Sequence, residues 1–164
     1  MAATHLIHGF IGSGKTTFAK ALEASEPRCI RFTHDEWVHQ LYGTTPPEQE
    51  FPEIFNRIDT LIWDTALSVL RNDCSVILDH GFWTESSRRN ARQRLETDGH
   101  RVQFYSVQCD LATMKKRTLA RSEAPPADSL WIDRKAFDTL YGQFEPMTDH
   151  ELRIEIDGSI DRVL

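Results

Sequence analysis

The sequence predicts an α/β fold in which helices flank a parallel sheet. Short apolar segments of strand character alternate with longer helical patterns along the chain. A glycine-rich segment directly follows the first of these strands. The 164 residues suffice for one domain with a sizeable core and leave little room for two. We therefore expect a single domain over residues 1–164.

Five segments are expected to be strands, because each is short, rich in β-branched or aromatic residues, and bounded by polar residues or glycine. In chain order they are Leu6–Ile7, Cys29–Phe32, Val76–Leu78, Val102–Val107 and Leu152–Ile156.

Longer patterns with helical periodicity lie between these strands. Ile54, Ile58 and Leu61 show the spacing of an amphipathic helix. We expect loops, and not domain linkers, at Gly43–Pro47 and Glu123–Ala127, because neither separates two pieces large enough to fold alone. The expected helices are Lys15–Ala24, a short one that Asp35 opens, Phe51–Arg71, Glu85–Asp98, Leu111–Arg121 and Asp133–Phe144.

Composition excludes several classes of protein. No apolar run reaches the roughly 18 residues that a membrane span needs. The first ten residues lack the basic and apolar regions of a secretory signal, so we expect a cytoplasmic protein. Cys29, Cys74 and Cys109 follow no metal-binding spacing and are expected to be buried free thiols.

The formal net charge is -6, but the charge is unevenly distributed. Residues 88–121 carry nine Lys and Arg against three acidic residues. The acidic remainder argues against a long nucleic-acid partner, since such binding depends on many phosphate contacts. The basic segment suits a small anionic ligand, although basic residues on two solvated helix faces would give the same pattern.

The segment Gly9–Thr16, GFIGSGKT, matches the phosphate-binding pattern G-x-x-x-x-G-K-[ST] in full. Its glycines let the backbone turn sharply and direct N–H groups at phosphate oxygens, and the helix that begins here adds its positive end. Lys15 is expected to reach the β- and γ-phosphates, Thr16 to offer its hydroxyl to Mg²⁺, and Thr17 to contact the α-phosphate. The predicted ligands are ATP and Mg²⁺, and the remaining nucleotide-binding positions are Gly9, Gly12, Ser13 and Gly14.

The rest of the chain narrows the chemistry of this phosphate-binding loop. The Asn-Lys-x-Asp string of GTPases is absent from the sequence. The chain is short for a transporter-type ATPase, and no residues remain for the helical lid domain of an assembly-type ATPase. A small-molecule kinase fits the length.

The chain resembles the P-loop kinases related to nucleoside monophosphate kinases. Within them it is similar to the compact AAA_33-type group that includes zeta toxins, chloramphenicol phosphotransferase and polynucleotide 5′-kinases. The resemblance implies a three-layer P-loop NTPase fold with a five-stranded parallel sheet in the order 2-3-1-4-5. It also implies an acceptor-side segment at about residues 36–60 and a lid at about residues 117–132. It covers most of the chain and rests on GFIGSGKT, THDEW after the second strand, VILDHGFW in and after the third, Lys115–Arg121 and Phe144–Pro146.

Asp35 lies where such kinases carry the aspartate that accepts the proton of the acceptor hydroxyl. A carboxylate just past the carboxyl end of a parallel strand lies at the ligand-binding edge of the sheet. The alternative is that Asp35 caps the helix containing Trp37 and Leu41, a role that Thr33 could serve instead.

Asp79 ends an apolar strand, as the acid that holds Mg²⁺ does in P-loop proteins. In this branch of the family it could instead contact the acceptor, and a strand-end turn residue is the structural alternative. Gly81 would permit close approach to a substrate. We interpret His80 as a packing or site-edge residue, because no partner lies at metal-ligand spacing.

The resemblance also assigns roles to three arginines and one more aspartate. Arg88 would contact the substrate. Arg117 and Arg121 share one helix face and would neutralise the transferring phosphoryl group from the lid, unless they are solvated surface charges. Asp157 would lie on the adenine side of the nucleotide. Aromatic residues that could line the acceptor pocket, or pack in the core, are Trp37, Phe82 and Trp83.

Three hypotheses for the function follow. The first is an ATP- and Mg²⁺-dependent kinase that phosphorylates a hydroxyl group of a small molecule. The second is a nucleotide-binding regulator or slow ATPase with no phosphoacceptor. The third is a polynucleotide 5′-hydroxyl kinase, suggested by the basic residues between 88 and 121. The sequence assigns neither the acceptor nor the oligomeric state.

Overall fold

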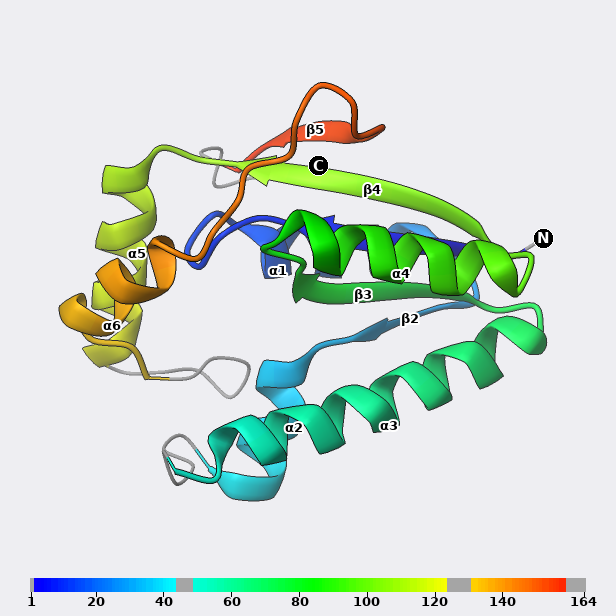
Figure 1. Ribbon diagram of the computed structural model, residues 1–164, viewed down its shortest axis with the longest axis horizontal. Coiled ribbons are helices and arrows are strands. Elements are labelled where there is room, and N and C mark those ends of the chain that lie inside the picture. Colours follow the sequence, from blue (N-terminus) through cyan, green and yellow to red (C-terminus); the bar gives the residue numbers. More distant parts are fainter. Residues whose placement is uncertain (1, 44–48, 124–130, 159–164) are drawn as a thin grey trace.

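A five-stranded parallel sheet in the order β2-β3-β1-β4-β5 forms the centre of the molecule (Figure 1). The computed structural model describes residues 2–43, 49–123 and 131–158. The predicted strand order is confirmed, and the fold is that of a P-loop NTPase. The strands are β1 (Ala3–His8), β2 (Cys29–Phe32), β3 (Ser75–Gly81), β4 (Arg101–Gln108) and β5 (Ile154–Asp157).

The described helices agree closely with those expected from the sequence. Phe51–Arg71 has the predicted bounds, and Glu85–Thr97 ends one residue early. Asp133 is the N-cap of the last helix, where its side chain accepts a hydrogen bond from the N–H of Ala136. The helices are α1 (Lys15–Ser25), α2 (His34–Tyr42), α3 (Phe51–Arg71), α4 (Glu85–Thr97), α5 (Leu111–Glu123) and α6 (Arg134–Tyr141).

Alternation along the strands gives each face of the sheet its own core. Helices α3 and α4 cover the face shown in front in Figure 1, where their apolar residues pack against Leu6, Leu78 and Phe104. On the other face, Phe18 and Ala19 of α1 pack against residues of β1, β3 and β4. The sheet is therefore the middle layer of three.

The carboxyl ends of β1, β2 and β3 lead directly into the segments that carry most of the candidate site residues. The P-loop connects β1 to α1, Thr33 connects β2 to α2, and Phe82–Thr84 connects β3 to α4. Helices α5 and α6 lie beyond this edge of the sheet (Figure 1) and contact the P-loop through a cluster around Phe10. This arrangement gathers the candidate residues at one edge.

Two further expectations concern the chain as a whole. All three cysteines are free, as predicted, but each is only partly buried, so the expectation of buried thiols was wrong. Among the described residues, no helix combines the length and the apolar character that crossing a membrane requires. Residues 44–48 and 124–130 lie outside the described residues. They include most of the two predicted loops, Gly43–Pro47 and Glu123–Ala127, and part of the predicted lid.

Candidate functional site

The P-loop has a conformation that depends on its glycines. Gly12 and Gly14 have φ of 79° and 100°, and Gly14 is the N-cap residue of α1. A Cβ atom on Gly12 would lie 2.4 Å from the carbonyl oxygen of Met114, so α5 packs directly against the loop. The first turn of α1, including half-buried Thr16 and exposed Thr17, offers N–H groups without intrahelical acceptors. The loop is therefore built to bind an anion.

Lys15 lies at the start of α1, and its Nζ donates a hydrogen bond to the carbonyl oxygen of Phe10 at 3.0 Å. Burial lowers the pKa of its ammonium, while the nearby charges of Asp79 and Asp35 raise it. Arg121 adds a further lowering contribution. Charges from four different segments therefore act on Lys15 or are carried by it. The four residues are Lys15 of α1, Asp35 of α2, Asp79 of β3 and Arg121 of α5.

Asp79, near the end of β3, is buried and its pKa is raised by that burial. The Thr16 hydroxyl hydrogen-bonds its side chain, and Arg31 Nη1 lies 3.4 Å from its Oδ2. Its Oδ1 is buried without a hydrogen-bond partner among the described residues. A free carboxylate oxygen beside a threonine hydroxyl provides the oxygen ligands that Mg²⁺ prefers, so these two residues fit a Mg²⁺ site.

Asp35 does not cap its helix. Thr33, with extended backbone, is the N-cap residue of α2, so Asp35 lies one position inside the first turn. Its side chain is open to solvent, and the surrounding protein nevertheless raises its pKa by desolvation, against the lowering effect of Lys15. The capping alternative is therefore wrong, and the carboxylate remains available for chemistry.

Arg31 is a site residue that sequence reasoning missed. Its guanidinium contacts three carboxylates: Nη2 pairs with Glu36, Nη1 with Asp79, and Nε lies 3.8 Å from Glu23. The pairing with Asp79 links β2 to β3 beside the predicted Mg²⁺ site. The available signal was a charged residue inside the otherwise apolar strand CIRF.

The two predicted lid arginines occupy different surroundings although they share one face of α5. Arg117 Nη1 donates a hydrogen bond to the carbonyl oxygen of Gly158 at 2.6 Å, at the end of β5. Arg121 instead affects the pKa values of both Lys15 and Asp35. Of the two, Arg121 is the one whose charge acts at the phosphate-binding centre.

Arg88 has a structural role, and the sequence interpretation of it as a substrate contact needs correction. It is 2% exposed, and its Nε and Nη2 pair with both carboxylate oxygens of Glu151. Its Nη1 donates to the carbonyl oxygens of Phe82, Trp83 and Glu145. The protein itself therefore occupies the hydrogen-bonding groups that a substrate would need.

The turn after β3 is held in a strained conformation. Phe82 has φ of 45°, which is rare for a non-glycine residue, and its carbonyl accepts hydrogen bonds from Arg88 and from His8 Nδ1 at 3.1 Å. Gly81 has φ of 84°, and a Cβ atom there would lie 2.7 Å from Trp83 Nε1. The indole of Trp83, and not a substrate, therefore approaches Gly81 closely in this structure.

Asp157 and Gly158 lie directly behind the P-loop. Asp157 ends β5, and the Gly158 N–H donates to the carbonyl oxygen of Gln108 at 2.7 Å. A Cβ atom on Gly158 would lie 1.8 Å from the carbonyl oxygen of buried Ser13. The end of β5 therefore supports the loop by direct backbone contact.

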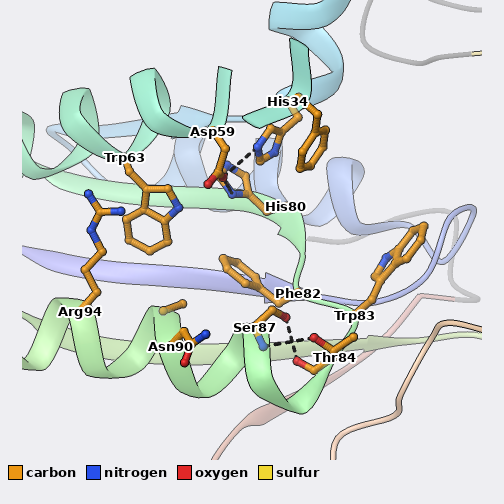
Figure 2. Close-up of a pocket in the computed structure, with 12 residues that line it drawn as sticks. His34, Asp59, Trp63, His80, Phe82, Trp83, Thr84, Ser87, Asn90 and Arg94 are labelled. Carbon is orange, nitrogen blue, oxygen red and sulfur yellow. Dashed lines mark hydrogen bonds and ion pairs between the residues drawn. The ribbon is translucent and has the colours of Figure 1, made fainter. Parts of the chain in front are cut away.

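A pocket of about 480 Å³ opens between α3, α4 and the end of β3 (Figure 2). Phe82 and Trp83 line it, and both also pack against the core clusters, as Trp37 does. The Arg94 guanidinium lies 4.7 Å from the ring centre of Trp63. The other lining residues are His34, Phe55, Asp59, His80, Thr84, Ser87, Asn90 and Ala91.

The family model AAA_33, described as an AAA domain, matches residues 5–147. No curated protein matches the chain. Among solved structures, one similar fold is that of a candidate kinase from Chloroflexus aurantiacus. It has a TM-score of 0.73 and 17% identity, with 95% of this chain and 88% of that chain covered.

Two other solved structures extend this similarity. The Pnkp1/Rnl/Hen1 RNA repair complex contains a chain with a TM-score of 0.67 and 22% identity, covering 87% of this chain but 43% of that one. Kti12 from Chaetomium thermophilum, solved with ADP-AlF3, gives a TM-score of 0.62 and 16% identity, covering 94% of this chain and 88% of that one. At these identities the similarity establishes the fold alone.

Proposed function

The chain belongs to the AAA_33 family of AAA domains, and from this premise we propose that it is a kinase. It transfers the γ-phosphate of ATP, with Mg²⁺, to a hydroxyl group of a small molecule. The observation that carries the proposal is the placement of Asp35, in the first turn of α2 directly after β2, at the same edge of the sheet as Lys15 at the start of α1. Each of these two charges also shifts the pKa of the other. This placement supports a carboxylate base positioned at the place where the P-loop lysine would hold the γ-phosphate.

The reaction needs a base and positive charge at opposite sides of one phosphorus atom. Asp35 would accept the proton as the acceptor oxygen forms its bond to the γ-phosphorus, and the bond from that phosphorus to the bridging oxygen of ADP would break. Lys15, the α1 N-terminus and Arg121 would neutralise the charge on the phosphate oxygens.

Magnesium would bind at Thr16 and Asp79, where a free carboxylate oxygen lies beside the threonine side chain. When bound, the ion would offset the charge of the β- and γ-phosphates. Arg31 orients Asp79 through its contact with Oδ2. This positioning keeps Oδ1 available.

The pocket between α3 and α4 is our candidate for the acceptor site. His34, which precedes Asp35, lines it, and so do residues directly after β3. Its volume of about 480 Å³ suits a small molecule. Aromatic walls with Ser87, Asn90 and Arg94 among them favour an acceptor with a flat apolar part and several polar groups.

A polynucleotide acceptor is less well supported. The basic residues between 88 and 121 do not share one surface, because α4 lies along the sheet and α5 beyond its edge (Figure 1). Several are paired within the chain: Arg88 with Glu151, Arg92 with Glu96, and Lys115 with Asp138. A track for several phosphates would need these charges to be available.

The proposal is tested by incubating the protein with ATP, Mg²⁺ and a panel of hydroxyl-bearing metabolites, and by measuring phosphorylated products with mass spectrometry. We expect a product from the wild type and none from Lys15→Ala. ATP hydrolysis without any phosphorylated product would instead support the slow ATPase. A product formed only with oligonucleotides, with a rate that falls steeply with salt, would support the polynucleotide kinase.

A further inference from the structure

Three side chains from three separate elements meet at one wall of the pocket: His34 from α2, Asp59 from α3 and His80 from β3 (Figure 2). We propose that they bind a divalent transition-metal ion, for which zinc is the best match. This site is distinct from the Mg²⁺ site proposed at Thr16 and Asp79. It does not depend on the proposed kinase activity.

The distances in the cluster are close to those of a coordination sphere. His34 Nε2 lies 2.9 Å from Asp59 Oδ1, and His80 Nδ1 lies 3.9 Å from the same oxygen. Bonds of 2.0–2.2 Å at tetrahedral angles place the ligand atoms of zinc roughly 3.3 Å apart. The two observed distances lie on either side of that value, so small side-chain rotations suffice to coordinate an ion.

Both imidazole rings are held in place by their neighbours. The ring of His34 stacks on Phe55 with 4.1 Å between centroids and meets the edge of His80 at the same separation. Phe82 stacks against the other ring, with 5.6 Å between centroids. Ligands fixed in this way need little ordering when an ion binds.

His80 itself points to an unfilled interaction. Its side chain is 5% exposed, and its Nε2 is buried without a hydrogen-bond partner among the described residues. Its Nδ1, which lies 3.9 Å from Asp59 Oδ1, also makes no hydrogen bond among the described residues and is therefore available to a metal ion.

Different contacts separate this cluster from the phosphate-binding centre. Asp79 and His80 are consecutive on β3, at an irregularity in the pairing of β3 with β1. Asp79 contacts Thr16 and Arg31, whereas His80 contacts His34. The two ions would therefore be bound by different sets of side chains.

The ligand set also selects the ion. Two imidazole nitrogens and one carboxylate oxygen are typical zinc ligands, while Mg²⁺ and Ca²⁺ prefer oxygen ligands alone. Three protein ligands leave a fourth position for water or for a ligand atom. Because all three residues line the pocket, a molecule bound there could supply that atom.

A second group of potential ligands, His5, Glu26 and Cys29, provides the competing explanation for any zinc binding. His5 Nε2 lies 2.8 Å from Glu26 Oε2. The test must therefore distinguish the two groups.

The test uses the full chain, freed of metal by a chelator and titrated with Zn²⁺ against a chromogenic indicator, without nucleotide or acceptor. We expect one Zn²⁺ per chain in the wild type and in Cys29→Ser. In Asp59→Asn and His80→Gln we expect affinity to fall by at least about tenfold. Thermal unfolding of the metal-free variants shows whether each still folds. Asp59 is much more exposed than His80, so Asp59→Asn tests the site even if His80→Gln does not fold.

Cobalt provides a second, independent readout. Co²⁺ bound by His34, Asp59 and His80 gives no thiolate-to-metal charge-transfer band, whereas binding through Cys29 does. The proposal is overturned if no Zn²⁺ binds, if folded Asp59→Asn binds as tightly as the wild type, or if the cobalt complex shows the thiolate band and loses it in Cys29→Ser. Each of these outcomes leaves the proposed kinase activity unaffected, because no step of the assay involves phosphoryl transfer.

Discussion

Arg88 of α4 and Glu151 form a two-point ion pair, with Nε 2.6 Å from Oε2 and Nη2 2.9 Å from Oε1. The pair joins α4 to the segment that precedes β5. Hydrogen bonding to Arg88 lowers the pKa of Glu151. Since Arg88 also binds the carbonyl of strained Phe82, this pair stabilises the turn that forms one wall of the pocket.

Replacing Arg88 by Ala is expected to lower the free energy of unfolding by about 3–5 kcal/mol, because it leaves a partly buried carboxylate without its charged partner and removes one donor from each of three carbonyl groups. Urea denaturation measures this. The matched control is Arg89→Ala, whose side chain is 67% exposed and pairs only within α4; its effect should stay within about 0.5 kcal/mol. A folded, equally stable Arg88→Ala with a raised KM for the acceptor would restore the substrate-contact interpretation.

Gly158→Ala is expected to weaken nucleotide binding about tenfold, or about 1.4 kcal/mol. The new Cβ atom would overlap the carbonyl oxygen of Ser13 and so displace the P-loop. Isothermal titration with ADP measures the change. The control is Gly99→Ala, because no atom lies within 4 Å of a Cβ atom at that position. Its positive φ should make the substitution lower the stability of the protein, but the ADP affinity should not change. Equal affinity in both variants would contradict the support we assign to β5.

Acid should destabilise the protein partly through His8. Burial lowers the pKa of His8 to about 4, from 6.5 in the unfolded chain. Between pH 4 and 6.5 the unfolded state binds more protons than the folded state, so lowering the pH favours unfolding. The contribution of His8 to the free energy of unfolding is therefore complete above about pH 6.5 and is lost as the pH falls towards 4. The total loss is about 3 kcal/mol. In urea denaturation, His8→Gln should therefore lose less stability than the wild type between about pH 7 and pH 4.5. Parallel losses in both proteins would show that His8 is not the group responsible.

Most of the fold could be predicted because the signals are local. Strand and helix patterns gave the elements to within a few residues, and the motif GFIGSGKT located the P-loop after β1. The sheet order came from the resemblance to a family, since strand pairing between β1, β3 and β4 joins residues distant in the sequence. Asp35 and Asp79 were identified because each follows or ends a strand.

The parts that sequence reasoning missed are contacts between distant elements. Asp59 is one of several acidic residues on α3, and nothing in its spacing indicates that it meets His34 and His80. Arg88 was misjudged because its partner, Glu151, is 63 residues away. A charge on a helix does not by itself show whether it faces a ligand or a buried carboxylate.

The central claim is that Asp35 is the general base for an acceptor hydroxyl. Its most direct test is the kcat of Asp35→Asn on the acceptor identified by the metabolite screen, with ADP affinity measured on the same sample and Glu53→Gln, at an exposed position of α3, as the control. We predict a fall in kcat of about 10²–10⁴-fold with ADP affinity preserved, and wild-type values for Glu53→Gln. A kcat for Asp35→Asn equal to that of the wild type would contradict the account.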